Sequence, residues 1–302
     1  MLQQTQVAVV GPAFQRFMAA FPSVEALAEA PLDAVMAMWA GLGYYMRARN
    51  LHQAARLIAK RGSFPDSMEA LTALPGIGRS TAAAIVSLAF DRPAAILDGN
   101  VRRVLARHAG IHGWPGDAAV LARLWALAEQ RLPDHDAAVY TQGLMDLGAT
   151  ICRRSRPDCR VCPVAVDCVA RHSELTVQIP APRPVRQRLR QALYMRLPID
   201  RNGVWLERRP PGGIWGGLWC APVGEALERE ADFSACHELT HRTLDLRVWF
   251  VGTQSMLAAE RASCTYFAWS DLVSLGMPRP MRDVLDGARR SDLADQIIEP
   301  AI

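Results

Sequence analysis

Hydrophobic residues in the first 170 positions recur at the three- and four-residue spacing of amphipathic helices. Proline and glycine residues separate these segments, and no convincing strand pattern interrupts them. The spacing predicts helices at residues 14–21, 24–30, 32–39, 51–58, 101–109, 118–132 and 137–151. The N-terminal region is therefore predicted to be mainly α-helical.

The pattern changes after residues 173–190, a polar and proline-rich stretch that we interpret as a linker. Beyond it, short runs rich in β-branched and aromatic residues predict strands, and helical spacing returns twice. The strands are expected at residues 192–197, 203–207, 244–252 and 265–269, and the helices at 224–230 and 280–287. A length of 302 residues fits two domains, which we place at residues 1–172 and 191–302. The second domain is predicted to be α+β.

A glycine-rich turn between two helices is predicted at LPGIGRSTA, residues 74–82. Gly76 and Gly78 allow positive φ and leave space for a ligand. The helix that follows, at residues 79–89, would direct free N–H groups towards that space, and such helix N-termini bind phosphate. Residues 66–90 therefore indicate a helix-hairpin-helix that binds a nucleic-acid backbone. An ordinary turn between packed helices is the alternative.

The helix before this turn carries its own start and stop signals. Asp66 and Glu69 have the spacing of a capping box, and Pro75 ends the helix that they open. These signals support the boundaries of the hairpin.

Four cysteines follow the predicted helices with the spacing C-x6-C-x2-C-x5-C. They are Cys152, Cys159, Cys162 and Cys168. The N-terminus lacks the pattern of a secretory signal, so the seven cysteines of the chain argue for thiols or metal ligands rather than disulfides. Four thiolates this close can bind one zinc ion or one [4Fe–4S] cluster. The presence of only one C-x2-C pair, together with the helix-hairpin-helix, favours the [4Fe–4S] cluster. The other three cysteines, Cys220, Cys236 and Cys264, are expected in the core or on the surface.

The cysteine loop is dense in arginine. It contains Arg153, Arg154, Arg156 and Arg160. A loop fixed by a metal would offer these side chains to phosphate groups, whereas a solvated surface is the alternative reading. The net charge of +4 and the isoelectric point near 8.8 permit an anionic partner without requiring one.

The glycine-rich turn, the LDGN sequence at residues 97–100 and the cysteine spacing together resemble the helix-hairpin-helix DNA glycosylases that carry an iron–sulfur loop. Endonuclease III and the MutY-type adenine DNA glycosylases share this plan, and the second family is the closer match. The similar motifs are residues 1–7 (MLQQTQV), 41–50 (GLGYYMRARN), 97–105 (LDGNVRRVL), 145–152 (MDLGATIC) and 209–219 (RPPGGIWGGLW).

The resemblance implies base excision repair of double-stranded DNA. The substrate would be adenine mispaired with 8-oxoguanine or guanine, which is flipped out of the helix and removed. We also expect a monomer, and a cytoplasmic location because the N-terminus lacks a secretory signal. No membrane partner is expected, since no apolar run is long enough to cross a bilayer.

The resemblance also assigns roles at the LDGN motif. Asp98 would stabilise the positive charge that develops on the sugar, and Asn100 would orient the site. Asp98 also fits the position of a helix N-cap, which is its alternative, structural role. Ser80 stands where endonuclease III has a lysine that attacks the sugar. Lys60 is the only lysine in the chain, so hydrolysis by a monofunctional glycosylase is expected rather than lyase chemistry.

Further residues match positions that contact DNA in the family. The resemblance implies that Leu2, Gln4 and Thr5 enter the double helix at the lesion and that Tyr44 inserts into the base stack beside it. Tyr44 taken by itself would more often belong to a hydrophobic core. The backbone of the DNA is expected to contact Gly76, Gly78, Arg153 and Arg154.

The second domain resembles a MutT-like, Nudix-fold module. Gly224 and Glu230 fit the first spacing of a Nudix box, but the later R-E-x-x-E-E acids are absent, so we expect recognition rather than pyrophosphate hydrolysis. The family reads 8-oxoguanine with a Phe-Ser-His turn. This chain has Leu239, Thr240 and His241, which retains a hydroxyl and the histidine but lacks the aromatic ring.

In the family, an S-E-V sequence precedes MLQQTQ, and its glutamate protonates the departing adenine. The sequence here begins at Met1, so we expect either a start upstream of Met1 or a form that binds the mispair and excises adenine slowly. A chain extended upstream to include the glutamate would be expected to excise it quickly. A lesion-binding protein without catalysis and a bifunctional glycosylase/lyase are the alternatives.

Overall fold

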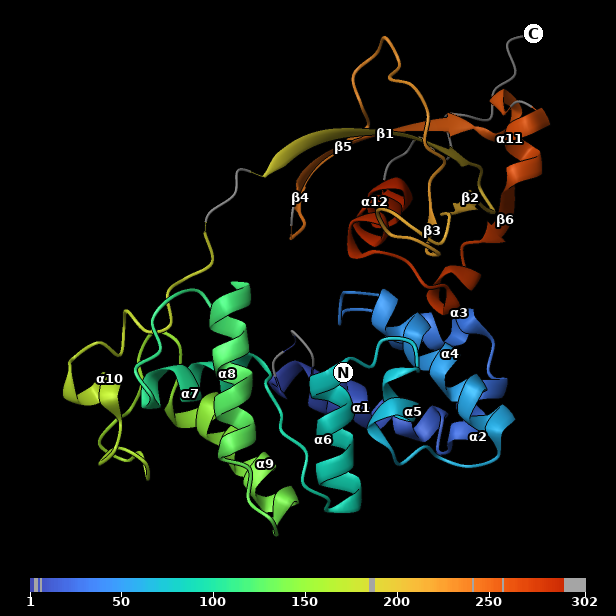
Figure 1. Cartoon of the computed structure of the whole chain (residues 1–302). Coiled ribbons are helices and arrows are strands. Elements are labelled where there is room, and N and C mark those ends of the chain that lie inside the picture. The colour runs from blue at the N-terminus through green and yellow to red at the C-terminus, as the bar shows by residue number, and fades with distance from the viewer. Residues whose placement is uncertain (3–4, 6, 185–187, 241, 257, 291–302) are drawn as a thin grey trace, which may run out of the picture. The chain divides into compact units, whose positions relative to one another are not determined.

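The computed structural model describes residues 1–290 apart from residues 3–4, 6, 185–187, 241 and 257. The chain forms two compact units, and Figure 1 labels their helices and strands. One unit joins Met1–Gly62 to Gln187–Ile302, and the other is Ser63–Arg186.

The first unit begins with four helices, which confirm the helices predicted there. They are α1 (Val7–Ala20), α2 (Val24–Glu29), α3 (Leu32–Met38) and α4 (Met46–Arg61). The hydroxyl of Ser23 caps α2 by accepting a hydrogen bond from the Ala26 N–H at 3.1 Å. Gly62 ends α4 in the left-handed conformation, with φ of +76°. The apolar faces of these helices bury Val35, Met36 and Trp39.

The same unit contains a six-stranded mixed sheet. Its strands are β1 (Leu189–Ile199), β2 (Gly203–Arg208), β3 (Trp219–Cys220), β4 (Phe233–Glu238), β5 (Arg242–Gly252) and β6 (Cys264–Ala268). The order is β3-β2-β1-β5-β4, and β6 pairs with β2. Only β1 and β5 run parallel among these pairs, with Leu193 opposite Leu246.

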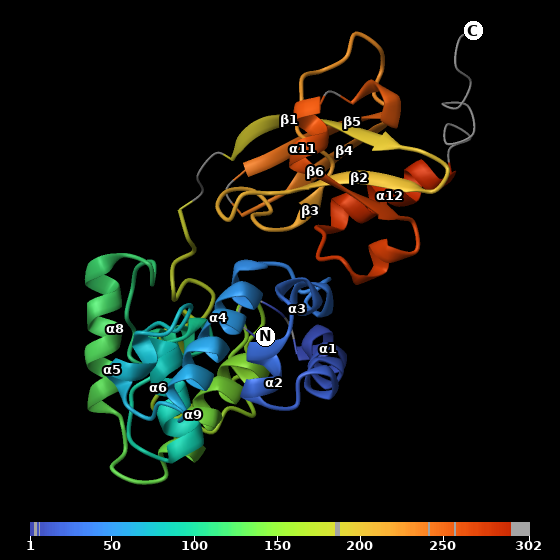
Figure 2. The same ribbon diagram turned by 90° about the vertical axis from the view of Figure 1, so that its right-hand side faces the viewer.

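Helix α12 (Arg279–Arg290) covers one face of this sheet, as Figure 2 shows. Its buried residues Met281, Val284 and Leu285 belong to one core with alternate residues of β1 and β5. The short helix α11 (Ala258–Ser263) precedes β6, and single turns of 3-10 helix lie at Thr253–Ser255 and Asp271–Ser274. The structure therefore confirms an α+β domain after the helical region.

The predicted helix at residues 224–230 is wrong, because these residues form a loop against the sheet. The Gly224 N–H donates to the Tyr194 carbonyl at 3.1 Å, and the Trp249 indole donates to the Arg229 carbonyl at 3.0 Å. These two hydrogen bonds attach both ends of the loop to neighbouring strands. Strand β4 was not predicted, although half-buried and exposed residues alternate along it.

Among its described residues, the second unit contains helices and loops but no strand. Its helices are α5 (Met68–Thr72), α6 (Arg79–Phe90), α7 (Gly99–His108), α8 (Ala118–Gln130), α9 (Ala137–Asp146), a π-helical turn (Leu147–Ile151) and α10 (Val169–His172). Helix α7 is central, because it contacts α8, α9, α10 and the π-helical turn. Leu97, Val101, Leu105 and Leu124 are among the fully buried residues of its core.

The cap predicted for α5 is also wrong. Ser67 is the N-cap, and its hydroxyl accepts a hydrogen bond from the Ala70 N–H at 3.2 Å. Asp66 lies one residue before this cap, and its carboxylate is 3.3 Å from the guanidinium of Arg92. Across the part of the chain that is described, no helix has the length and apolar character needed to cross a membrane.

Candidate catalytic and DNA-binding site

The turn between α5 and α6 presents an open helix N-terminus. Gly76 has φ of +77°, a conformation that favours glycine. Gly78 is the N-cap of α6, and no side chain caps this helix. A Cβ on Gly78 would meet no atom within 4 Å, and both glycines are exposed. The first N–H groups of α6 are therefore accessible to an anion such as a phosphate.

Ser80 ties this turn to the LDGN motif. Its hydroxyl accepts a hydrogen bond from the Leu97 N–H at 2.9 Å. The neighbouring Arg79 packs its guanidinium 3.8 Å from the centre of the Trp125 ring and pairs with Glu129. The start of α6 is thus linked by a hydrogen bond to the residue before Asp98.

Asp98 is the N-cap of α7. One of its carboxylate oxygens, Oδ1, accepts a hydrogen bond from the Val101 N–H at 2.7 Å, which confirms the structural role expected for it. The side chain is only half-buried, and among the described residues Oδ2 accepts no further hydrogen bond. This oxygen is available to a bound molecule.

Arg103 orients Asn100 from one turn further along α7. Its Nη2 donates to Asn100 Oδ1 at 2.9 Å and to the Gly148 carbonyl at 2.7 Å, and its Nε donates to the Cys152 carbonyl at 2.7 Å. Burial lowers the pKa of Arg103, while the nearby Cys152 and Asp98 favour its charged form. A Cβ on Gly148 would lie 2.6 Å from the Asn100 Cβ, so the close approach of the two segments requires glycine.

Arg107 lies one turn beyond Arg103 and is only 2% exposed. Its Nη1 donates to the Arg153 carbonyl at 2.7 Å and to Cys152 Sγ at 3.3 Å, and its Nη2 donates to the Arg154 carbonyl at 2.9 Å. A third nitrogen, Nε, donates to the Ile179 carbonyl at 2.8 Å. The buried charge is therefore satisfied by backbone carbonyls and a thiol, and the cysteine loop is fixed to α7.

Sequence reasoning missed Arg103 and Arg107 as site residues. Their spacing of four positions, within the apolar face that carries Val101, Val104 and Leu105, was a usable signal. Two arginines on the buried face of a helix need partners inside the fold.

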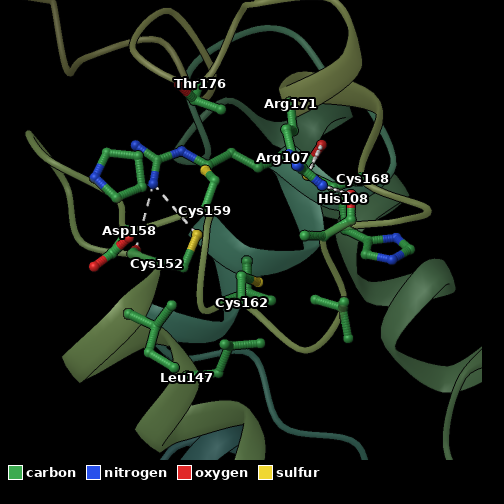
Figure 3. Close-up of a pocket in the computed structure, with 15 residues that line it drawn as sticks. Arg107, His108, Leu147, Cys152, Asp158, Cys159, Cys162, Cys168, Arg171 and Thr176 are labelled. Atoms are coloured by element: carbon green, nitrogen blue, oxygen red, sulfur yellow. Dashed lines mark hydrogen bonds between the residues drawn. The ribbon is translucent and has the colours of Figure 1, made fainter.

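The four cysteines of the loop line one pocket together with Val104, Leu147 and Ile151 (Figure 3). The four cysteines are free thiols. Burial raises the pKa of Cys159, and the neighbouring cysteines add to that rise. Among the described residues, no group of three or more Cys, His, Asp or Glu side chains is arranged so that it could hold a metal ion as it stands. Four soft sulfur donors around one pocket, with Arg107 donating to one of them, nevertheless fit a thiolate-bound metal centre.

Arg153 and Arg154 are exposed on the same loop. Their carbonyls are fixed by Arg107, whereas no hydrogen bond or ion pair of their guanidinium groups occurs among the described residues. Arg160, by contrast, lies 3.5 Å from Asp158. The first two arginines are therefore free to bind an anion.

A second group of the predicted residues gathers in the first unit. Tyr44 is 50% exposed and has φ of +48°, so it is not a core residue. Its hydroxyl lies 3.3 Å from the Thr240 hydroxyl, which is in the turn between β4 and β5. Arg47 lies 5.4 Å from the centre of the Tyr44 ring and donates to the Thr5 hydroxyl at 3.1 Å. Arg47, which sequence reasoning did not single out, thus contacts both Thr5 and Tyr44, and Tyr44 in turn contacts Thr240.

Leu2 is exposed, and Arg47 binds the neighbouring Met1 carbonyl at 2.9 Å. Gln4 and His241, also predicted at this site, lie outside the described residues. Ser80, Asp98, Asn100 and the cysteine loop belong to the unit Ser63–Arg186, whereas Thr5, Tyr44 and Thr240 belong to the other unit.

Comparison with known proteins identifies the class to which this fold and these sites belong. Residues 1–130 match the HhH-GPD superfamily of base excision DNA repair proteins, and residues 194–287 match the NUDIX domain family. A thermostable thymine-DNA glycosylase of known structure has a TM-score of 0.50 and 28% identity over 57% of this chain and 80% of its own. Endonuclease III in complex with DNA shares the fold, with a TM-score of 0.50 and 24% identity over 58% of this chain and 81% of its own.

Two relatives with higher sequence identity identify the family within this class. The adenine DNA glycosylase of Buchnera aphidicola subsp. Acyrthosiphon pisum is 33% identical over 311 residues, which cover 96% of this chain and 89% of that protein. The human adenine DNA glycosylase is 44% identical over 174 residues, covering 57% of this chain and 32% of that protein. The chain belongs to the adenine DNA glycosylase family.

Proposed function

We propose that this protein is a monofunctional adenine DNA glycosylase that hydrolyses the N-glycosidic bond of adenine paired with 8-oxoguanine or guanine. The observation that carries the proposal is the position of Asp98. A carboxylate with one uncommitted oxygen lies at the N-terminus of α7, and Ser80 connects it to the open N-terminus of α6. The relatives named above support adenine as the base that is removed.

Cleavage of an N-glycosidic bond leaves positive charge on the sugar, and a nearby carboxylate lowers the energy of that state. The phosphate-binding turn would hold the DNA backbone beside the flipped nucleotide, and Asp98 would face the anomeric carbon. Asn100, fixed by Arg103, would orient the sugar or the attacking water. Because the Asp98 side chain is already fixed as an N-cap, little reorganisation would be required during the reaction.

Hydrolysis is favoured over lyase chemistry because Lys60, the single lysine of the sequence, lies outside both the helix-hairpin-helix and the LDGN motif. Ser80 offers a hydroxyl that is bonded to the Leu97 N–H, and Lys60 belongs to α4 in the other compact unit. A Schiff base with the sugar requires an amine nucleophile. The product would be an abasic site in an unbroken strand.

Tyr44, Thr240 and Thr5 would recognise the base opposite adenine. Their hydroxyl groups can donate or accept hydrogen bonds to a purine edge, and the exposed ring of Tyr44 can stack on a base. The Nudix-like domain lacks the acidic residues of a pyrophosphatase, which supports a recognition role for the turn that contains Thr240.

Cys152, Cys159, Cys162 and Cys168 would bind a [4Fe–4S] cluster. When bound, the cluster would cross-link the loop through four thiolates, and Arg107 would donate a hydrogen bond to one of them. Arg153 and Arg154 would then be presented to DNA phosphates from a fixed loop.

The test is a single-turnover assay with excess protein on duplexes containing adenine opposite 8-oxoguanine, guanine or thymine. Release of adenine from the first two duplexes, with strand breaks only after alkaline treatment, is expected. Asp98→Asn should lower the rate by at least about 10² while keeping the helix cap, because asparagine is an equally good N-cap. Strand breaks before alkaline treatment would favour a lyase. Tight binding of the mispair without any adenine release would favour a lesion-binding protein.

A further inference from the structure

Arg49, on α4, binds a loop of the Nudix-like domain. Its Nη1 donates to the Pro211 carbonyl and its Nη2 to the Gly216 carbonyl, both at 2.7 Å. A Cβ on Gly217 would lie only 1.6 Å from Arg49 Nη2. The guanidinium therefore occupies the space that any side chain at Gly217 would need, and residues 209–217 wrap around it.

The residues just before Arg49 make two more contacts with the same domain. The Tyr45 hydroxyl donates to the Met277 carbonyl at 2.8 Å, and the Tyr44 hydroxyl lies 3.3 Å from that of Thr240. Burial raises the pKa of Tyr45, so its hydroxyl remains a donor at neutral pH. Consecutive tyrosines thus lie against two different segments of the domain, with Arg49 one helical turn later.

The loop that Arg49 binds is connected to the turn that carries Thr240. Trp215 has φ of +55°, and its ring lies 6.0 Å from the ring of His237 on β4. Three residues after His237, Thr240 follows Leu239, whose N–H donates to the Arg242 carbonyl at 2.8 Å. Trp215 also packs against the helical core of residues 1–62 and the core of the sheet. The loop therefore supports the end of β4 from beside α4.

The pair of Tyr44 and Thr240 is exposed, and such a hydrogen bond contributes little in water. Two charge-assisted hydrogen bonds from a guanidinium to carbonyls, in a loop shaped around it, are stronger and more specific in direction. The position of Thr240 relative to Tyr44 is thus set by Arg49 more than by the two hydroxyls themselves.

We propose that Arg49 is a positioning residue for recognition of the base opposite adenine. It fixes residues 209–217 against α4, and through Trp215 and β4 it keeps the Thr240 hydroxyl beside Tyr44. This inference rests on the proposed function, because it assigns opposite-base discrimination to that pair.

The test compares Arg49→Ala with Arg56→Ala, an exposed arginine on the same helix. Discrimination is measured as the ratio of the dissociation constants for duplexes with adenine opposite guanine and opposite 8-oxoguanine. Arg49→Ala should lower this ratio at least about fivefold, and Arg56→Ala should leave it unchanged. In a Thr240→Ala background, Arg49→Ala should cause no further loss, since both act on one interaction.

Hydrogen exchange of the DNA-free proteins gives a second readout. Arg49→Ala should speed exchange of the amides at residues 237–240, and Arg56→Ala should not. If Arg49→Ala does not fold, Arg49→Lys keeps the charge and one hydrogen bond, and its loss of discrimination should be smaller but measurable. A wild-type protein that does not discriminate would refute the recognition role proposed for Tyr44 and Thr240, while the exchange data would still test the contact. A discriminating wild type with unchanged discrimination in Arg49→Ala and Arg49→Lys would overturn the role of Arg49.

Discussion

Arg107 donates a hydrogen bond to Cys152 Sγ at 3.3 Å from a position that is only 2% exposed. The same guanidinium binds the carbonyls of Arg153, Arg154 and Ile179. Helix α7, which carries Arg107, is capped at its N-terminus by Asp98. The proposed sugar-stabilising carboxylate and the anchor of the cysteine loop therefore belong to one rigid element.

Replacing Arg107 by methionine should destabilise the second unit. Methionine keeps much of the volume but leaves buried carbonyls without donors, and the loss of such charge-assisted bonds is expected to cost about 3–5 kcal/mol. The temperature of thermal unfolding and the iron content of the purified variant should both fall. Arg123→Met, at an exposed position of α8, is the matched control. Equal stability of the two variants would show that the loop does not depend on Arg107.

The purified protein should be brown and contain iron and sulfide. Four thiols lining one pocket are the basis of this expectation. Metal analysis of anaerobically prepared protein should give about four iron atoms per chain. Cys159→Ser should lose the colour, whereas Cys236→Ser, at an exposed cysteine on β4, should keep it. Zinc without iron would refute the cluster.

Binding to DNA should weaken steeply with salt and depend little on sequence. Each phosphate contact contributes a slope of about 0.9 in a log–log plot, so replacing Arg153 and Arg154 together by alanine should lower the slope by roughly one to two. Replacing both by lysine keeps the charges and should leave the slope nearly unchanged. The slope is measured by titrating a labelled duplex at several salt concentrations. An unchanged slope in the alanine variant would show that the loop does not contact DNA.

Removing the hydroxyl of Tyr44 or of Thr240 should weaken discrimination between 8-oxoguanine and guanine opposite adenine more than it weakens binding to undamaged duplex. Thr240→Ala and Tyr44→Phe each remove one hydroxyl of the pair at 3.3 Å, and the loss of hydrogen bonds to 8-oxoguanine should cost about 1–3 kcal/mol. His241→Ala is expected to act in the same direction. Tyr44→Phe keeps the ring, so binding of undamaged duplex should be retained. Equal losses on damaged and undamaged duplexes would assign a structural role to the turn.

Two substitutions at Asp98 should separate its structural and chemical roles. Asp98→Ala removes the acceptor for the Val101 N–H and should lower stability by about 1 kcal/mol. Asp98→Asn keeps that acceptor and should unfold at nearly the wild-type denaturant concentration. Both variants should lose adenine excision. A fall in stability for Asp98→Asn equal to that of Asp98→Ala would mean that the charge, rather than the cap, stabilises α7.

Local signals in the sequence determined most of the helical region. Apolar spacing placed the helices, Gly76 and Gly78 marked the hairpin turn, and Asp98 was expected as an N-cap. These predictions hold because caps, turns and amphipathic faces depend on residues within one or two turns of each other. The same locality explains the error at Asp66, since Ser67 offers an equally suitable oxygen one residue later.

Only the tertiary structure decided which distant residues meet. Residues 224–230 have helical spacing, yet they form a loop. The Gly224 N–H at one end of this loop bonds to Tyr194, and the Arg229 carbonyl at the other end accepts from the indole of Trp249. Nothing in the sequence links Arg49 to Pro211 and Gly216, or Tyr44 to Thr240 across 196 positions. Such contacts depend on how sheet and helices pack together, because a hydrogen bond forms wherever folding brings a donor to an acceptor.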